Sequence, residues 1–530
     1  MTGFGLEELA TGARFLTRLP GFLRHRLSPE EARVILRRRL ERRADDFMAL
    51  ARVAIYGNPR SPYRALLRLA GCELGDLEQL VHRHGVEHSL ATLLRAGVYL
   101  RVEEFKGRLP VVRGGARITL DQSGLRNPQA GAPVFARTGG SRGAAMPLFV
   151  DLDFIRDRAV TTALALEARG GSGWRHASWG VPGGAIVRIL DLAVAARPPA
   201  RWFSPTDPRD VSLHPRYRWS ARAIRWASIA AGVPLPIPEY VPPEHPEPIA
   251  GWVAETLRAG CTPHIHTFAS LGVRLCRTAL AAGVDIGGAR LTLSGEPVTD
   301  ARLAETRRAG VEASPCYSTM ETGPIGYGCL APAAADDVHL LHDMHALIQP
   351  GPESAPPGVS AEALFLSSLR PTASPILLNV SLGDQAVATE RACGCPLEAL
   401  GWTTHLHDVR SHEKLTAGGT TFLDTDAIRV LDEALPRRFG GGPTDYQLVE
   451  GADGDGRPVL HLRVHPQLGS VSLEAVAETF LAELGGGVGA ERIMSALWRN
   501  GRVLRVERSI PVATASGKIL HLHVEPRQPA

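Results

Sequence analysis

The feature that most constrains the fold is an alternation of short apolar segments with helical ones over about residues 158–309. Thr262–Phe268 and Arg290–Ser294 have the length and apolar content of short buried strands, and each precedes a segment with helical spacing, Val273–Ala282 and Asp300–Ala309. Neighbouring parallel strands need a crossover connection, which is usually a helix. The alternation therefore predicts a mostly parallel sheet with helices on its faces.

Two other regions depart from this alternation. The proline-dense segment Val233–Pro248 interrupts it, and its composition predicts a surface loop. Towards the C-terminus we expect short strands and two helices, at Asp445–Glu450, Val459–Val464, Arg505–Arg508, Leu473–Leu484 and Gly489–Trp498. The predicted fold class is α/β, a large N-terminal domain followed by a small α+β domain. We expect a helical region at 1–125 that belongs to the large domain, its core at 126–410 and the small domain at 411–530.

Composition narrows the class of protein. Hydrophobic residues make up 44% and charged residues 22% of the 530 residues, which is typical of a globular protein. A net charge of +4 is too small to predict a nucleic-acid partner. The chain contains no apolar run long enough for a membrane span and no signal-peptide pattern. Seven cysteines are an odd and sparse set, which disfavours a disulfide framework and favours the reducing cytoplasm.

A glycine-rich turn at 138–143 follows a short apolar segment. Glycines let successive backbone N–H groups converge on phosphate oxygens, and hydroxyl groups add donors. The GxxxxGK[ST] pattern of a Walker P-loop is absent. Taken alone, this turn is better explained as an ordinary loop, because glycine-rich turns are common in this chain.

Further motifs follow this turn in a fixed order. They are Gly295-Glu296-Pro297, Tyr317-x-x-x-Glu321-x-Gly323, Asp384 within Ser-Leu-Gly-Asp, Arg410, and Gly517-Lys518. The lysine stands out because the 59 basic residues include only three lysines.

In its order and spacing, this series resembles the acyl-adenylate-forming superfamily and, within it, the phenylacetate–coenzyme A ligase branch. The resemblance extends from roughly residue 130 to 520. It implies ATP-dependent activation of a carboxylic acid, aryl or arylacetic, as an acyl-adenylate. The acyl group would then pass to the thiol of coenzyme A, with Mg²⁺ as a cofactor and with a small C-terminal domain that rotates between the two steps.

The resemblance also implies a role for each motif residue. Phosphate binding falls to Thr138, Gly139, Gly140, Ser141, Arg142 and Gly143, and contacts to the adenine to Gly295, Glu296, Pro297, Tyr317, Ser318 and Thr319. Asp384 would accept from the ribose hydroxyls with help from Arg410, and Glu321 would hold Mg²⁺. Lys518 would bridge the substrate carboxylate and the α-phosphate, and Trp174 and His176 would form a wall of the acid pocket.

Two departures from the family pattern leave alternatives open. Ala144 stands where the phosphate loop usually has lysine, and Met320 stands where the second motif usually has a hydroxyl residue. One alternative is an acyl-adenylate ligase that loads a carrier protein or an amine. Another is a nucleotide-binding homologue without catalytic activity. Neither nucleic acid nor membrane is expected as a partner.

Cysteine and histidine form a second constellation. Cys329, His339, Cys393 and Cys395 together offer the donors of a tetrahedral Zn²⁺ site, with His342 as the rival to His339. Buried cysteines are also common as small apolar residues without a metal. In the resembling branch these positions correspond to a structural metal site, so we expect structural zinc here. His264 and His266 lie on a predicted strand, where histidines of the protein core are expected.

Overall fold

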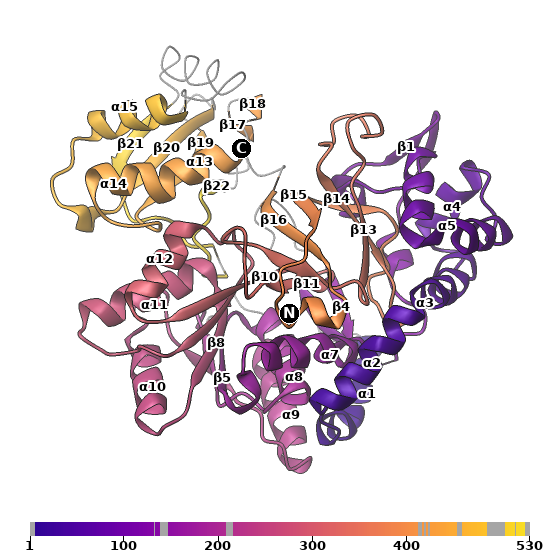
Figure 1. Ribbon diagram of the computed structural model, residues 1–530, viewed down its shortest axis with the longest axis horizontal. Coiled ribbons are helices and arrows are strands. Elements are labelled where there is room, and N and C mark those ends of the chain that lie inside the picture. Colours follow the sequence, from indigo (N-terminus) through magenta and orange to yellow (C-terminus); the bar gives the residue numbers. More distant parts are fainter. Residues whose placement is uncertain are drawn as a thin grey trace.

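The computed structural model describes residues 6–131, 133–137, 147–207, 216–411, 416–417, 420–421, 424–452, 458–484, 504–514 and 516–524. Its centre is a 12-stranded sheet in the order β13-β14-β15-β16-β12-β11-β10-β9-β8-β5-β6-β7 (Figure 1). The strands of this sheet are β5 (Arg175–Trp179), β6 (Arg201–Ser204), β7 (Pro238–Tyr240), β8 (Pro263–Phe268), β9 (Arg290–Ser294), β10 (Glu312–Thr319), β11 (Gly323–Gly328), β12 (Val338–Leu340), β13 (His345–Ile348), β14 (Ala363–Ser368), β15 (Val380–Glu390) and β16 (Thr404–Ser411). The predicted α/β class is confirmed.

The half of the sheet from β10 to β7 is parallel, as the alternation predicts. Alternate residues of these strands face opposite helical layers. Ile265, Leu291 and Leu293 pack in one core with residues of α10 and α11, whereas α7 and α8 belong to the core on the other face. The helices of this half are α7 (Leu152–Ala168), α8 (Pro182–Ala195), α9 (Arg216–Ala230), α10 (Glu247–Arg258), α11 (Ala269–Ala281) and α12 (Asp300–Arg308).

The prediction of a surface loop at Val233–Pro248 is wrong in part. Pro238–Tyr240 forms β7, which pairs in parallel with β6 and lies at the edge of the sheet, and Glu247 already begins α10. Prolines are tolerated there because an edge strand has one side free of sheet hydrogen bonds.

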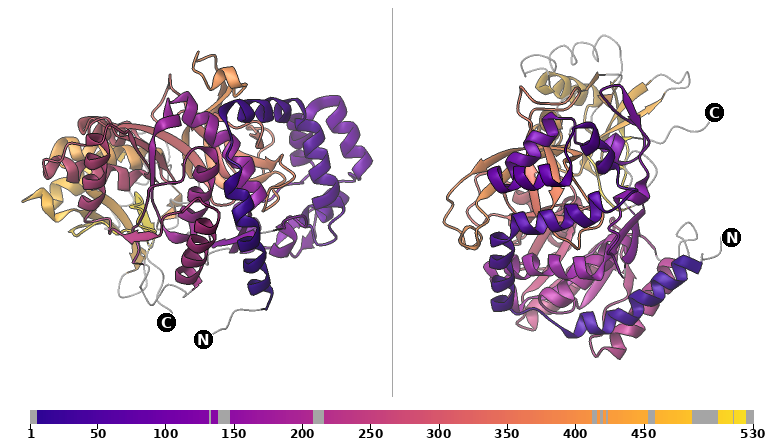
Figure 2. Two further views of the ribbon diagram at one scale, coloured as in Figure 1. Left: turned by 90° about the horizontal axis from the view of Figure 1, so that it is seen from below. Right: turned by 90° about the vertical axis from the view of Figure 1, so that its right-hand side faces the viewer.

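The N-terminal helices share the core of the antiparallel half. Phe15, Phe47 and Tyr63 are buried in the same cluster as Phe365 and Leu406 of the sheet. Figure 2 shows these helices, indigo to purple, on the side of the molecule away from the yellow C-terminal part. The remaining elements of the first 151 residues are α1 (Leu6–Arg24), α2 (Pro29–Glu41), α3 (Arg43–Leu50), α4 (Pro62–Leu69), α5 (Leu74–Arg95), α6 (Val102–Phe105), β1 (Val111–Arg113), β2 (Ala116–Ile118), β3 (Pro133–Arg137) and β4 (Pro147–Asp151).

The C-terminal part, here called the small unit (residues 424–524), has a sheet and a core of its own. Its four strands run in the order β21-β20-β19-β22, and α15 covers them with the same bounds that the sequence predicts. The helix predicted at Gly489–Trp498 lies outside the described residues. The elements of this part are β17 (Thr416–Ala417), β18 (Thr420–Thr421), α13 (Asp424–Arg429), α14 (Leu435–Phe439), β19 (Tyr446–Ala452), β20 (Pro458–Val464), α15 (Leu473–Leu484), β21 (Leu504–Arg508) and β22 (Leu522–Val524).

No helix in the described part of the chain is both long and apolar enough to cross a membrane.

Candidate active site

Several predicted site residues meet where the parallel strands end. Gly295 follows β9 directly, Phe268 ends β8, and Glu321 lies in the turn between β10 and β11. The C-terminal ends of parallel strands lie along one edge of a sheet, which is where ligands bind in open α/β folds. We call this edge the strand-end site.

Lys518 reaches the strand-end site from the small unit. Its Nζ donates a hydrogen bond to the carbonyl oxygen of Gly295 at 3.0 Å and lies 4.6 Å from the centroid of the Phe268 ring. Gly517, with φ +82°, lets the loop approach closely, since a Cβ there would lie 2.9 Å from Cβ of Pro205. The structure therefore brings Lys518 and Gly295 together.

Glu296 points into the protein rather than towards an open ligand site. Its carboxylate accepts from the backbone N–H of Ser270 at 2.7 Å and from the Ser270 hydroxyl at 3.0 Å. Arg302 lies 3.9 Å from the same carboxylate, and both side chains are only 1% exposed. Arg302 also donates to the carbonyl oxygen of Pro297 at 3.1 Å. The side chain of Glu296 thus braces the loop instead of reaching outward as the adenine contact expected from the resemblance.

Tyr317 and Asp384 come together from different strands. The Tyr317 hydroxyl donates to Oδ2 of Asp384 at 3.0 Å. Burial raises the pKa of Tyr317 well above its ordinary value, and the nearby Asp384 carboxylate raises it further. The phenol is therefore protonated at neutral pH and acts as a donor to Asp384.

Arg410 is not brought to Asp384. Its guanidinium donates to Asp336 at 2.8 Å, and its cross-strand partner in the sheet is Gln385. In the register of β15 and β16, Asp384 lies opposite Ser411, one position away from the pair that contains Arg410. Because side chains alternate between the two faces of a sheet, those of Asp384 and Arg410 point to opposite faces. The assistance to the ribose that the resemblance implies for Arg410 is therefore not visible in this arrangement.

The remaining residues of the second motif form a compact turn. Thr319 Oγ1 accepts from the backbone N–H of Thr322 at 3.2 Å and lies 3.0 Å from its hydroxyl. Glu321 is 9% exposed. Ser318 lies at an irregularity of the β10–β11 ladder. A carboxylate at this place suits a hard cation such as Mg²⁺.

The glycine-rich turn, Thr138, Gly139, Gly140, Ser141, Arg142 and Gly143, lies outside the described residues. The strands on either side of it, β3 and β4, are antiparallel and pair Arg137 with Pro147.

Trp174 and His176 lie beside β8 on the face covered by α7 and α8. Trp174 is buried, and its ring centroid lies 5.3 Å from that of His264. Nδ1 of His176 lies 2.9 Å from Nδ1 of His264. Both predicted pocket residues therefore lie beside His264, the cross-strand neighbour of His176.

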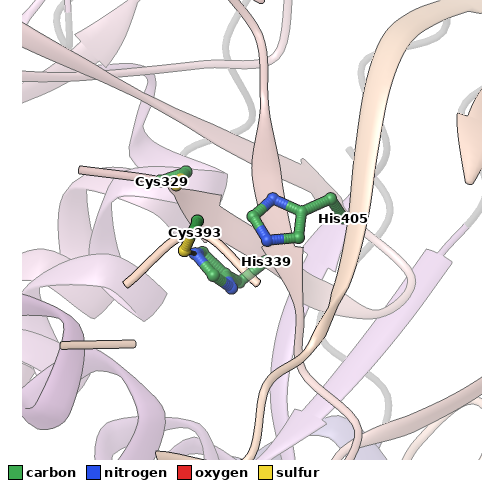
Figure 3. A group of neighbouring side chains, drawn as sticks. All are labelled: Cys329, His339, Cys393 and His405. Carbon is green, nitrogen blue, oxygen red and sulfur yellow. Dashed lines mark hydrogen bonds between the residues drawn. The ribbon is translucent and has the colours of Figure 1, made fainter. Parts of the chain in front are cut away.

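The predicted metal ligands also meet. Cys329, His339, Cys393 and His405 each offer a donor atom, and these atoms lie within 4.8 Å of one another (Figure 3). Cys395 Sγ lies 3.2 Å from Nε2 of His339, so the fourth predicted ligand borders the same group. His342 is not part of the group, which favours His339 over its rival.

The surroundings orient these donors. Nδ1 of His339 lies 2.6 Å from the carbonyl oxygen of Trp402, which directs Nε2 towards Cys393 and Cys395. Nε2 of His405 is buried without a partner among the described residues, and its Nδ1 lies 2.7 Å from Asp337. The geometry fits a thiolate- and imidazole-binding metal.

Two thiols of this group have opposite pKa shifts. Burial raises the pKa of Cys329 to about 12. Burial also disfavours the Cys395 thiolate, but backbone N–H groups of Leu330, Glu398 and Leu397 outweigh it and lower the pKa of Cys395.

Sequence reasoning missed the residues that join the small unit to the strand-end site. Asp432 accepts from Thr299 Oγ1 at 2.9 Å, lies 3.2 Å from Nε of Arg302 and lies 2.9 Å from Nε2 of His521. The Ile519 N–H donates to the Ser270 hydroxyl at 3.2 Å. We call Arg302, Asp432 and His521 the buried triad. No local pattern marks these residues, because their partners lie far away along the chain.

No family model and no curated protein matches the chain. Among solved structures, the chain is similar to 2-hydroxyisobutyryl-CoA ligase in complex with 2-HIB-AMP and CoA, at 16% identity over 92% of this chain and 90% of that chain, with a TM-score of 0.46. The anthranilate CoA ligase in complex with anthranoyl-AMP shares 11% identity over 78% and 68%, with a TM-score of 0.44. The o-succinylbenzoate coenzyme A synthetase from Bacillus subtilis, in complex with ATP and magnesium, shares 13% over 73% and 68%, with a TM-score of 0.40. At these identities and TM-scores, the function has to be argued from this chain's own residues.

Proposed function

We propose that the chain is an ATP-dependent ligase that activates a carboxylic acid as its acyl-adenylate and transfers the acyl group to the thiol of coenzyme A. The observation that carries the proposal is Lys518, whose ammonium group is held at the carbonyl oxygen of Gly295 beside the strand ends. Gly295 and Lys518 belong to the two ends of the motif series. The resemblance extends the proposal to an aryl or arylacetic acid.

Each residue at the strand-end site has a physical task in this reaction. The Lys518 ammonium neutralises the negative charges of the carboxylate and the α-phosphate, whose mutual repulsion opposes attack. The Tyr317 ring and the Asp384 carboxylate offer a stacking surface and an acceptor for a nucleoside, and the hydrogen bond between them holds both in place. Glu321 would hold Mg²⁺, which supplies charge neutralisation at the phosphates.

The decisive experiment is carboxylate-dependent exchange of labelled pyrophosphate into ATP, measured over a panel of aryl, arylacetic and aliphatic acids. We expect exchange with at least one acid, because the first step is reversible without a thiol acceptor. An absence of exchange over the whole panel would instead favour a nucleotide-binding protein without catalytic activity, the alternative suggested by Ala144 and Met320. Thioester formation with free coenzyme A, compared with a phosphopantetheine carrier protein and an amine, then identifies the acceptor.

We also propose that Cys329, His339, Cys393 and Cys395 hold a structural Zn²⁺. The support is the convergence of sulfur atoms on Nε2 of His339. His405, which sequence reasoning did not include, lies in the same group and offers a fifth donor. A closed set of protein donors is typical of structural rather than catalytic zinc.

A further inference from the structure

A small cavity lies between the sheet and the layer formed by α7 and α8, whose elements are labelled in Figure 1. Its volume is about 20 Å³, and its walls include Arg169, Arg188, His264 and His266. None of the residues that line it carries a carboxylate. A space of this size holds one or two water-sized groups.

Positive charge around the cavity exceeds negative charge. Arg188 is paired with Asp191 at 2.9 Å. Arg169 donates to neutral acceptors, the hydroxyl of Thr292 at 2.9 Å and the carbonyl oxygen of Leu291 at 3.1 Å. Arg158 is buried nearby and interacts electrostatically with the same Asp191, so one carboxylate faces two guanidinium groups. Burying guanidinium charge without a matching anion is costly, so a site of this kind is completed by an anion.

The charge on Arg169 persists at neutral pH. Burial, with a contribution from Arg290, lowers its pKa to about 10, which still leaves the guanidinium protonated. Burial lowers the pKa of His264 and His266 well below the ordinary value, so both rings are neutral. A neutral imidazole has one N–H donor, and Nε2 of His266 is buried without a partner among the described residues.

The strand that lines the cavity ends at the strand-end site. His264 and His266 alternate with Ile265 and Thr267 along β8, so the two imidazole rings share one face, whereas Phe268 at the end of the strand packs against the cluster of Ile265. His266 and Phe268 are half-buried, whereas Ile265 and Thr267 between them are buried. The Phe268 ring lies 4.6 Å from Nζ of Lys518. Alternate residues of a strand are ~7 Å apart, and Nζ of Lys518 lies a further 4.6 Å from the Phe268 ring, so the cavity lies roughly 10–15 Å from the ammonium group.

The two neighbouring strands, β9 and β10, contribute hydroxyl groups to the wall of the cavity. In the register of the sheet, His266 lies beside Thr292, and Thr292 lies beside Ser314. Thr292 and Ser314 both line the cavity, which places their hydroxyl groups with His266 and Arg169. These donors converge from β8, β9, β10 and the end of α7.

We propose that this cavity binds a small anionic group, such as a second carboxylate of the acid that the enzyme activates, held roughly 10–15 Å from the reacting carboxylate. This inference rests on the proposed function for the identity of the substrate, but not for the binding of an anion. A free anion of similar size is the other source of the same chemistry. The acid selected would then be a bifunctional one rather than a purely apolar aryl acid.

The test compares diacids of graded length with their monomethyl esters in pyrophosphate exchange. We expect at least one diacid to have a KM ten or more times lower than its own monoester, because only the diacid places an anion among the cavity donors. Arg169→Gln is expected to raise the KM of that diacid at least tenfold. Arg175→Gln replaces an exposed arginine at the start of β5 and should leave it at the wild-type value.

A second measurement keeps the proposal falsifiable if Arg169→Gln does not fold or if no acid is activated. Formate and chloride are titrated against the melting temperature of the full chain without ATP, in the wild type and in His266→Phe, whose larger ring would occupy the cavity. Stabilisation that is lost in His266→Phe, without any diacid preference, assigns the cavity to a free anion. Equal KM values for diacids and monoesters together with no anion-dependent stabilisation would overturn the proposal. Anion-dependent stabilisation without exchange by any acid would support the anion site while contradicting the proposed ligase activity.

Discussion

Lys518 is one of three lysines in a chain of 530 residues, and its side chain reaches the strand ends. In the proposed reaction its charge is needed while the carboxylate attacks the α-phosphorus, and not when the thiol attacks the finished adenylate. This difference separates a catalytic lysine from one that merely stabilises the fold.

We therefore expect Lys518→Ala to lower the rate of adenylate formation at least 10²-fold, equivalent to about 2.7 kcal/mol of activation free energy. The same variant, given synthetic acyl-adenylate and coenzyme A, should form the thioester at a rate near that of the wild type. Single-turnover kinetics of the two half-reactions provide the measurement. An equal loss in both would mean that the lysine acts through folding rather than through charge.

Asp384 is the second residue with a separable role. Its carboxylate already accepts from Tyr317, and in the proposed site it would also accept from ribose hydroxyls. A hydrogen bond to a charged group contributes roughly 1.5–3 kcal/mol, so Asp384→Ala should weaken ATP binding about tenfold or more. Tyr317→Phe is the matched control, because it removes the same hydrogen bond to Asp384 but keeps the ring and the carboxylate. Calorimetry that found the same ATP dissociation constant in Asp384→Ala would remove this residue from the site.

At the scale of the structural elements, the proposed zinc site at Cys329, Cys393 and Cys395 can be tested by measuring metal content. The purified protein should contain about one equivalent of Zn²⁺, and Cys395→Ser should lower both the zinc content and the melting temperature. Cys261→Ser is the control, since Cys261 is exposed and lies outside the group. Less than half an equivalent of zinc in protein never exposed to a chelator would contradict the site.

Elements whose patterns are local could be predicted from the sequence. Arg290–Ser294 and Leu473–Leu484 have the predicted bounds, because apolar spacing and caps are properties of neighbouring residues. β7 could not be predicted, since its three residues lie in a proline-rich segment and form a strand only because β6 offers its edge. The inward turn of Glu296 and the pairing of Arg410 with Asp336 depend on partners brought together by the fold.

At the scale of the whole molecule, the buried triad joins the small unit to the strand-end site. Arg302 and Asp432 are 1% exposed, so removing this carboxylate would break the shorter ion pair of a buried guanidinium and leave it only Glu296, at 3.9 Å. Breaking such a buried pair costs about 3–5 kcal/mol, and here that loss weakens the contact between the two parts of the chain.

Asp432→Asn is accordingly expected to reduce adenylate formation at least tenfold, because the small unit no longer holds Lys518 at the strand ends. Small-angle X-ray scattering should show a larger radius of gyration than in the wild type. Glu474→Gln, which changes an exposed carboxylate on α15, serves as the control. An unchanged radius together with wild-type adenylation would show that the triad does not hold the small unit in place.

The contacts of Lys518 with Gly295 and of Ile519 with Ser270 also cover the strand ends. If the small unit rotates away between the two steps, as the resemblance implies, the Gly295 carbonyl and the Ser270 hydroxyl have to take water molecules as partners. Water that enters there meets the mixed anhydride of the proposed reaction, and hydrolysis then competes with the incoming thiol. In the proposed reaction, the time that the small unit spends away would then set how many ATP molecules are consumed for each thioester formed, and the buried triad would control the efficiency of the reaction as well as its rate.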